Sequence, residues 1–272
     1  MAHIGRLLTL FILFTLSSFS VQARYASIVV DTNSNTVLHE ENADVQNYPA
    51  SLVKMMTLYL TFSALSRNQL KLDQQLKVSK HAGSMAPSRL GLKVGQTIRA
   101  EEAILAIVTK SANDAAVVLA EALGGSESKF VQMMNNKANT LGMKRTVFRN
   151  ASGLPNGRQV STARDMSILA QALLRDFPEY YHFFSAVDFH YLNVTYINHN
   201  RLLNNYGGAD GIKTGYTRAS GFNLVTSVKR SDHRLIAVVF GGKTAQSRDK
   251  HMVKLLDTAF ARINTSTGVA LK

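Results

Sequence analysis

Apolar residues recur along the chain with two periods, one typical of strands and one typical of helices. The changes between these periods divide the chain into three stretches. Near the N-terminus, residues 26–30 (ASIVV) and 36–39 (TVLH) flank the turn-rich string Asp31-Thr-Asn-Ser-Asn35, which predicts a β-hairpin. Beyond Pro49, apolar side chains recur at helical spacing over residues 51–66. The apolar face of this segment is wide, so the helix should be largely buried.

The middle third is rich in alanine and has helical periodicity throughout. The pattern predicts helices over residues 100–109, 114–123, 126–141 and 161–176. Gly124-Gly125 and Gly142 are typical stop signals for the second and third of these helices, and Ser126 is a capping-type residue.

In the last third the pattern becomes strand-like, over residues 189–197, 221–229 and 235–240, before a final amphipathic helix at 247–263. The order of strands, helices, strands and helix predicts an α/β (α+β) fold. We expect an antiparallel sheet flanked by helices, built from about 24–66 and 185–265, with an all-helical insertion at about 80–180. One domain should span 24–272, with no C-terminal β domain.

The first 23 residues have the layout of a secretory signal peptide. Arg6 precedes an apolar run at residues 7–16, and Val21-Gln-Ala23 offers a cleavage site. The alternative is a membrane anchor, but a spanning helix needs roughly 18–20 apolar residues. We therefore expect an exported protein that begins at Arg24 and has no transmembrane anchor after cleavage.

Composition narrows the possible partners. The 272 residues carry a formal net charge of +13 and no cysteine, so an exported chain must rely on core packing alone. A positive charge favours polyanions. However, the basic residues are scattered without an aromatic-interleaved patch, so no nucleic-acid partner is expected. An anionic wall polymer or membrane surface fits better, and a merely solvated basic surface fits equally well.

Three short strings carry the chemistry: Ser51-Leu-Val-Lys54, Ser111-Ala-Asn113 and Lys213-Thr-Gly215. Together they describe a serine acyl-transfer site without histidine. A serine hydroxyl needs a base, and Lys54 lies one helical turn beyond Ser51 on the same face. In a dry cleft near other cations, a lysine can lose its proton near neutral pH. The helix N-terminus adds a backbone N–H for an oxyanion.

Taken singly, these strings are weak evidence. Ser126-Glu-Ser-Lys129 has the same spacing as the first string, and we interpret it as a helix cap with a solvated lysine. The second string should lie between two helices, where its hydroxyl could relay a proton and its amide could hold Lys54 and a substrate amide. The alternative for Ser111 and Asn113 is helix capping.

The third string suits an edge strand that aligns an extended peptide by backbone pairing. Gly215 would let a substrate backbone come close, and Lys213 would attract a carboxylate. Lys243-Thr-Ala245 lacks the glycine, and Ala237 replaces the glycine that a phosphate loop would need. The eight histidines have no metal-ligand spacing, so neither a metal nor a cofactor is expected.

Longer strings around these motifs occur in the same order as in one known family. They are Pro49-Ala-Ser-Leu-Val-Lys-Met-Met56, Lys110-Ser-Ala-Asn-Asp-Ala115, Asn150-Ala-Ser-Gly-Leu154, Ala163-Arg-Asp-Met166, Asp210-Gly-Ile-Lys-Thr-Gly-Tyr-Thr217 and Gly241-Gly-Lys-Thr244. Over residues 26–263 the chain resembles the low-molecular-mass penicillin-binding proteins, the serine D-alanyl-D-alanine carboxypeptidases. The resemblance implies the penicillin-binding/serine β-lactamase-like transpeptidase fold.

The resemblance also implies a role for each site residue. Ser51 would be the acylated nucleophile, Lys54 its base and Ser111 a proton relay. Substrate would be held by Asn113, Lys213, Thr214 and Gly215. The backbone N–H groups of Ser51 and Tyr216 would form the oxyanion hole. Arg248 would bind the terminal carboxylate with Thr214, and Arg201 is a weaker candidate. Some members have histidine in place of Tyr216, so no side-chain role is implied there.

The function implied is that of an exported, periplasmic or wall-associated carboxypeptidase. It would remove the terminal D-alanine of peptidoglycan stem peptides through an acyl-enzyme, and β-lactam antibiotics would acylate the same serine. The alternatives are a D,D-endopeptidase or transpeptidase at the same site, or a non-catalytic penicillin-sensing or wall-binding protein. A β-lactamase is disfavoured, since residues 154–166 contain no glutamate for deacylation.

Overall fold

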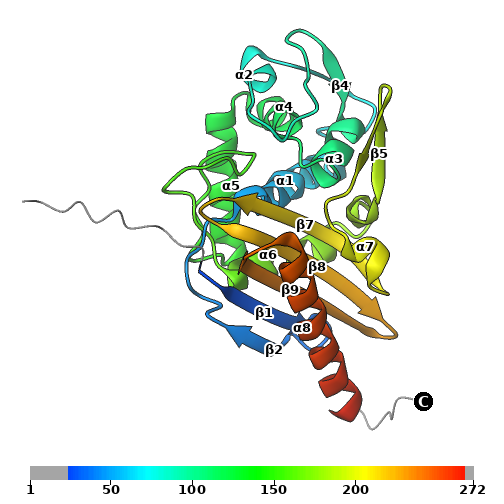
Figure 1. Ribbon diagram of the computed structural model, residues 1–272. Helices are drawn as coiled ribbons and strands as arrows, with labels where there is room; N and C mark the ends of the chain where they lie inside the picture. Colours follow the sequence, from blue (N-terminus) through cyan, green and yellow to red (C-terminus); the bar gives the residue numbers. More distant parts are fainter. Residues whose placement is uncertain (1–23, 267–272) are drawn as a thin grey trace, which may run out of the picture.

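The computed structural model describes residues 24–266, so the predicted signal peptide at 1–23 lies outside the described residues. Its centre is a five-stranded antiparallel sheet in the order β2-β1-β9-β8-β7 (Figure 1). The strands are β1 (Ala26–Asp31), β2 (Thr36–Glu41), β7 (Ala209–Thr217), β8 (Gly221–Arg230) and β9 (His233–Gly242). The predicted N-terminal hairpin is confirmed, and β1 joins the C-terminal strands through β9.

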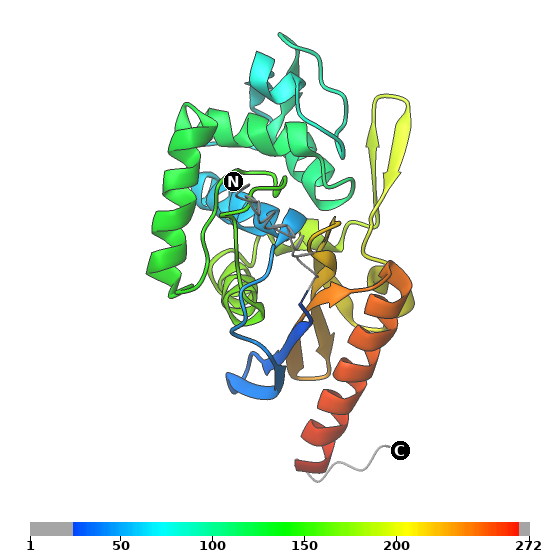
Figure 2. The same cartoon turned by 60° about the vertical axis from the view of Figure 1, so that its left-hand side comes forward.

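Helices cover both faces of this sheet, as Figures 1 and 2 show. Strands β1 and β9 are apolar at successive positions because each face has its own core. Ile28 and Val30 face the core shared with α6 (Ala163–Asp176). Val29 lies between them in sequence and faces the core formed with α8 (Ala245–Ser266). An unbroken apolar run is the pattern expected of a strand buried on both faces.

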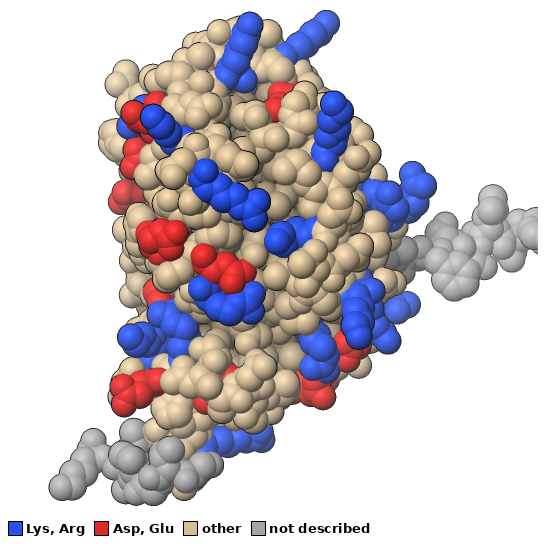
Figure 3. Space-filling model, turned by 180° about the vertical axis from the view of Figure 1, so that it is seen from behind, with Lys and Arg blue, Asp and Glu red and all other residues tan. Residues whose placement is uncertain are grey.

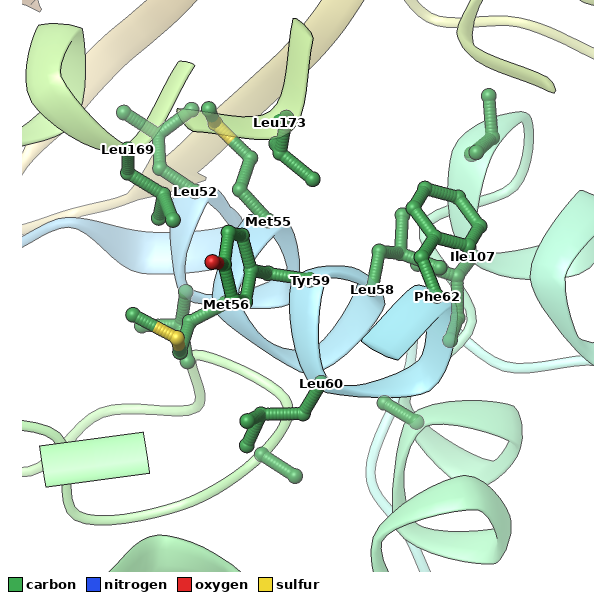
Figure 4. Packing of buried hydrophobic residues seen from close by; sticks show 14 of the residues in the cluster. Leu52, Met55, Met56, Leu58, Tyr59, Leu60, Phe62, Ile107, Leu169 and Leu173 are labelled. Carbon is green, nitrogen blue, oxygen red and sulfur yellow. The ribbon is translucent and has the colours of Figure 1, made fainter. Parts of the chain in front are cut away.

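The helical part lies between β2 and β7 in sequence. It comprises η1 (Ala50–Val53), α1 (Lys54–Ser66), α2 (Lys80–Gly83), α3 (Ala100–Val108), α4 (Asn113–Gly124), α5 (Glu127–Leu141) and α6. Helix α1 is buried almost all round, as predicted from its wide apolar face (Figure 4). The predicted fold class is confirmed, but the expectation that the insertion at about 80–180 is all-helical is wrong. Strands β3 (Gln75–Lys77) and β4 (Thr97–Arg99) form a two-stranded sheet within the helical part.

The single strand predicted over residues 189–197 is wrong. The segment is a separate hairpin, β5 (Asp188–Tyr191) and β6 (Val194–Ile197), which projects beside the helical part in Figure 1. The chain reverses at Leu192, which has a φ of +51° and is 80 % exposed. Glycine usually occupies such a turn position, because leucine rarely adopts this backbone conformation. Since the turn contains no glycine, the sequence gives no sign of the reversal.

The remaining connections complete the path to the sheet edge. In sequence, the short helix η2 (Tyr181–Ser185) precedes the β5–β6 hairpin and the short helix α7 (Leu202–Asn205) follows it. None of the helices within residues 24–266 combines the length and apolar character of a membrane span. On the face that Figure 3 shows, lysines and arginines are scattered among acidic side chains, as the sequence indicates.

Candidate functional site

The predicted site residues meet at one cleft of about 1090 Å³, where strand β7 faces the helical part. Strand β7 is an edge strand of the sheet, as predicted. The predicted residues that line the cleft are Ser51, Ser111, Asn113, Arg201, Thr214, Gly215, Tyr216 and Arg248. Lys54 and Lys213 are buried, with only 0 % and 1 % of their surface exposed. The three strings are therefore assembled in space.

Ser51 and Lys54 form the centre of this arrangement. Ser51 lies in η1 and Lys54 is the first residue of α1, so one helical turn brings the Lys54 Nζ within 3.1 Å of the Ser51 Oγ. Nζ also donates to Asn113 Oδ1 at 2.7 Å and to the backbone carbonyl of Ser152. The predicted reach from amine to hydroxyl is confirmed.

The surroundings of Lys54 favour its neutral form. Burial lowers the pKa of Lys54 well below its ordinary value, and the charge of Lys213 lowers it further, while Asp114 opposes the shift. A neutral amine has two N–H groups and one lone pair. Asn113 Oδ1 and the Ser152 carbonyl can accept the two N–H bonds, which leaves the lone pair for the Ser51 hydroxyl. This is the arrangement that a general base needs.

Two glycines leave the space that the turn carrying Ser51 occupies. Ala50 has a φ of +49°, a strained conformation for alanine. A Cβ on Gly153 would lie 2.0 Å from the Ala50 carbonyl oxygen, and one on Gly215 would lie 3.1 Å from the Ser51 N. We expected Gly215 to make room for a substrate backbone. In the structure its lack of a side chain also makes room for the Ser51 turn.

The loop that contains Gly153 is itself tightly hydrogen-bonded. Asn150 Oδ1 accepts from the Gly153 N at 2.7 Å, and Asn150 Nδ2 donates to the Leu154 carbonyl at 3.0 Å. Glu127 Oε1 accepts from the Ala151 N at 2.9 Å. Residues 150–154 match one of the family's strings, but the sequence alone indicated no function for them. The structure shows that this loop presents Ser152 to Lys54 and Gly153 to the nucleophile turn.

Ser111 lies between α3 and α4, as expected, and Asn113 is the first residue of α4, but the helix-capping alternative is wrong. The N-cap of α4 is Ala112, and no side chain makes a cap bond there. The buried Ser111 Oγ has no hydrogen-bond partner among residues 24–266, and the backbone of Ser111 has a φ of +60°. Asn113 Nδ2 donates to the Ala86 carbonyl at 2.8 Å. One amide N–H of Asn113 therefore remains for a ligand.

Lys213 and Arg248 form a cationic group at one end of the cleft. Burial, and next the charge of Arg248, lower the pKa of Lys213 to about 7. The Lys213 Nζ donates to the Thr214 carbonyl at 3.1 Å. Arg248 is only 3 % exposed, so its guanidinium is a buried cation of the cleft and not a solvated surface charge. Its guanidinium binds Asp249 at 2.6 Å and the Asn223 carbonyl at 3.2 Å.

Two further residues border the cleft. Tyr216 is 56 % exposed, and its ring lies 4.2 Å from that of Phe222. His199 is a cleft residue that sequence reasoning missed. Burial lowers the pKa of His199 to about 4, with Lys213, Lys110 and Arg248 contributing in that order. Its imidazole is therefore neutral at pH 7, and the surrounding charges show that this end of the cleft suits an anion.

The second Ser-x-x-Lys string has no such setting. Ser126 is the N-cap of α5, and its Oγ accepts from the Lys129 backbone N at 3.3 Å. The interpretation of this string as a helix cap is confirmed. Identical spacing thus gives a local cap in one place and, in the other, a serine hydroxyl within hydrogen-bonding distance of a buried lysine.

Comparison with known proteins agrees with this geometry. Residues 14–244 match the model of peptidase family S11, D-alanyl-D-alanine carboxypeptidase. The chain is 37 % identical over 246 residues to the D-alanyl-D-alanine carboxypeptidase DacF of Bacillus subtilis (strain 168), covering 88 % of this chain and 63 % of that protein. It is 38 % identical over 245 residues to the D-alanyl-D-alanine carboxypeptidase DacA of Escherichia coli (strain K12), covering 88 % and 61 %.

The chain thus spans less than two thirds of the length of these two relatives. A solved structure, Penicillin-Binding Protein D2 from Listeria monocytogenes in the ampicillin-bound form, superposes with a TM-score of 0.79 at 32 % identity. The superposition covers 86 % of this chain and 96 % of that one. The chain therefore belongs to the D-alanyl-D-alanine carboxypeptidase family of serine peptidases, S11.

Proposed function

We propose that this protein is a serine D-alanyl-D-alanine carboxypeptidase acting on peptidoglycan stem peptides. The observation that carries the proposal is the Ser51–Lys54 pair, set in a cleft beside an edge strand. The amine is buried and its pKa is low, so it can take a proton from the hydroxyl. The names of the two relatives support the same activity.

Acylation follows from the positions of these groups. The substrate pairs with β7 and places its scissile carbonyl against Ser51. Lys54 takes the Ser51 proton as Oγ attacks the carbonyl carbon, and the backbone N–H groups of Ser51 and Tyr216 stabilise the oxyanion. The C–N bond then breaks. Ser111, whose hydroxyl has no partner among the described residues, donates its proton to the departing amine of D-alanine and takes the proton that Lys54 holds, so that Lys54 is neutral again.

Deacylation uses the same base a second time, now to activate water. Lys54 removes a proton from water, whose oxygen attacks the ester carbonyl of the acyl-enzyme. The ester bond breaks, and Ser51 recovers its proton. The products are free D-alanine and a stem peptide shortened by one residue, so no cofactor enters the reaction.

Recognition of the terminal carboxylate falls to the cationic end of the cleft. Arg248 and Lys213 supply positive charge there, and the Thr214 hydroxyl adds a hydrogen bond. Asn113 holds the substrate amide with its remaining N–H. A β-lactam, whose strained amide mimics the scissile bond, would acylate Ser51. The ampicillin-bound form of the Listeria protein, which has the same fold, supports this.

We also propose that the protein works outside the cytoplasm, in the periplasm or against the cell wall. The predicted signal peptide at residues 1–23 supports export.

The decisive experiment uses the protein from Arg24 onward and a diacyl-lysyl-D-alanyl-D-alanine tripeptide. Free D-alanine should appear, and fluorescent penicillin should label the protein. Ser51→Ala should abolish both, whereas Ser126→Ala, the matched change in the other Ser-x-x-Lys string, should abolish neither. Penicillin labelling without any D-alanine release would favour the non-catalytic alternative. Mass spectrometry of treated muropeptides would reveal endopeptidase or transpeptidase products instead.

A further inference from the structure

Glu127, the first residue of α5, binds two segments that are distant from each other in sequence. Its side chain is only 16 % exposed. Oε1 accepts from the Ala151 N at 2.9 Å, and Oε2 lies 2.6 Å from the His81 Nε2. Glu127 does not line the cleft, so a substrate bound there does not reach it. An effect of Glu127 on the reaction would therefore act through its two partners or through its charge.

The first partner leads to one of the two acceptors of the Lys54 amine. Glu127 holds the N–H of Ala151, and the Ala151 carbonyl accepts from the Thr57 Oγ1 at 2.7 Å. The next carbonyl along the chain, that of Ser152, accepts from the Lys54 Nζ. Because Ala151 is held at both its N–H and its carbonyl, the direction of the Ser152 carbonyl is fixed.

The second partner leads to the other acceptor. His81 lies in α2, and the chain continues from this helix to Ala86. The Ala86 carbonyl accepts from the Asn113 Nδ2 at 2.8 Å. This bond orients the amide so that its Oδ1 faces the Lys54 Nζ, 2.7 Å away. Both acceptors of the Lys54 amine are thus held by segments that meet at Glu127.

We propose that Glu127 is a positioning residue that aligns both hydrogen-bond acceptors of the neutral Lys54 amine. With both acceptors in place, the lone pair of the amine faces the Ser51 hydroxyl. When an acceptor shifts, the amine turns and proton transfer slows. Glu127 therefore acts on the acylation step and not on binding. The proposal rests on the role of Lys54 in the proposed function, but acylation by penicillin tests it without a peptide substrate.

The test measures fluorescent penicillin labelling at several concentrations, which separates the maximal acylation rate constant from the binding constant. Glu127→Ala should lower the maximal rate about ten- to a hundredfold, because a misplacement of about 1 Å can cost about a hundredfold. The binding constant should stay unchanged.

Two conservative variants separate the reach of the side chain from its charge. Glu127→Gln keeps an acceptor for the Ala151 N, and its amide can donate to His81, so most of the rate should return. Glu127→Asp keeps the charge but is one methylene shorter, so acylation should remain slow. This pair carries the same test if Glu127→Ala fails to fold.

Glu102 provides the matched control. Its Oε2 accepts from the Arg99 N at 3.0 Å, and its Oε1 pairs with the Arg99 side chain at 3.3 Å. Glu102 also lies outside the cleft lining, so Glu102→Ala loses the same kinds of bond and should acylate like the wild type. His81→Ala should slow acylation less than Glu127→Ala. Adding it to Glu127→Ala should cause no further loss, because both changes act through one carboxylate.

Three results would overturn the positioning role. They are an unchanged maximal rate in Glu127→Ala, an equal loss in Glu102→Ala, and a fast Glu127→Asp beside a slow Glu127→Gln, which would assign the effect to charge. Release of D-alanine from the tripeptide reports separately on the proposed function. A wild type that is labelled but releases no D-alanine would refute the carboxypeptidase function alone, and one that is not labelled would refute both.

Discussion

At the scale of single residues, the surroundings of a side chain decide its chemistry. Ser51 and Ser126 each precede a lysine by three residues. Ser126 bonds its own helix, whereas Ser51 meets a buried amine that Asn113 and Ser152 orient from two other segments. Desolvation then lowers the pKa of Lys54, which a lysine in a solvated helix would not experience.

The first prediction at this scale concerns the base. Lys54→Arg places a permanent cation at this position and cannot supply a neutral amine at working pH. The rate of Ser51 acylation by fluorescent penicillin should fall by about a thousandfold, within the usual range for loss of a general base. Lys129→Arg, in the string that caps α5, should acylate normally. Near-normal acylation of Lys54→Arg at pH 7 would remove Lys54 from this role.

A second prediction concerns the terminal carboxylate. Arg248 is buried at the cleft, and a guanidinium can bind a carboxylate through two charge-assisted bonds. Arg248→Ala should slow cleavage of a peptide with a free C-terminus more than that of the same peptide amidated. The preference for acid over amide, taken as the ratio of the two kcat/KM values, should shrink by about tenfold. An unchanged preference would leave Lys213 and Thr214 as the carboxylate-binding residues.

At the scale of elements, the loop at residues 150–154 does as much as any helix to shape the site. It is not regular secondary structure, yet its internal hydrogen bonds and its bond to Glu127 hold it in place. Its backbone contacts both Lys54 and the turn before Ser51. A rigid loop of this kind sets the position of the nucleophile without contributing a reactive side chain.

The prediction at this scale is that Gly153 tolerates no side chain. Gly153→Ala would place a Cβ 2.0 Å from the Ala50 carbonyl oxygen, at a φ of +83° that already disfavours alanine. The variant should lose more stability than the about 1–3 kcal/mol typical of one strained residue, and its penicillin labelling should fall. Thermal unfolding and labelling would measure both effects.

The segment that follows this loop offers a matched control. A Cβ on Gly157 would meet no atom within 4 Å, and its φ lies outside the positive range that disfavours side chains. Gly157→Ala should therefore unfold and label like the wild type. If the two variants behaved alike, close packing of Gly153 against the Ser51 turn would not be what positions the nucleophile.

At the scale of the whole molecule, the site exists because the sheet edge meets the helical part. Strand β7 is left at the edge, and η1 and the α3–α4 connection bring their side chains against it. Two lysines are buried as a result. This arrangement favours reactivity over stability, because each buried amine loses its hydration.

This leads to a prediction for stability against pH. The pKa of Lys213 is about 7 in the folded protein and near 10.5 in an unfolded chain. Between these values the unfolded state binds more protons, so the contribution of Lys213 to the free energy of unfolding rises with pH. Lys213→Met should raise Tm at pH 7, by about 2–4 °C for each kcal/mol gained. The gain should shrink as the pH approaches 10.5.

The exposed Lys243, in the string that lacks a glycine, provides the control. Lys243→Met removes one positive charge without relieving a buried amine, so Tm at pH 7 should change little. Thermal unfolding of both variants from pH 6 to pH 10 would check this. A gain for Lys213→Met that stayed constant across this range would contradict the proposed cause.

Several features of this protein could be predicted from the sequence because they depend on neighbours in the chain. The spacing of Ser51 and Lys54 is one helical turn wherever a helix forms. The N-terminal hairpin, the glycine stops of α4 and α5 and the strand character of β8 and β9 are also local properties. The order of these elements was sufficient to predict the class of fold.

Other features were decided only by the tertiary structure, because they depend on segments that are distant in sequence. The Ser152 carbonyl meets Lys54 across 98 residues, and no spacing rule relates the two. The burial of Arg248 and the packing of Gly153 against Ala50 likewise required the folded chain. The hydration and dielectric environment of a side chain follow from its burial. The sequence places a lysine three residues after Ser51, but the low pKa of that lysine is a property of the assembled cleft.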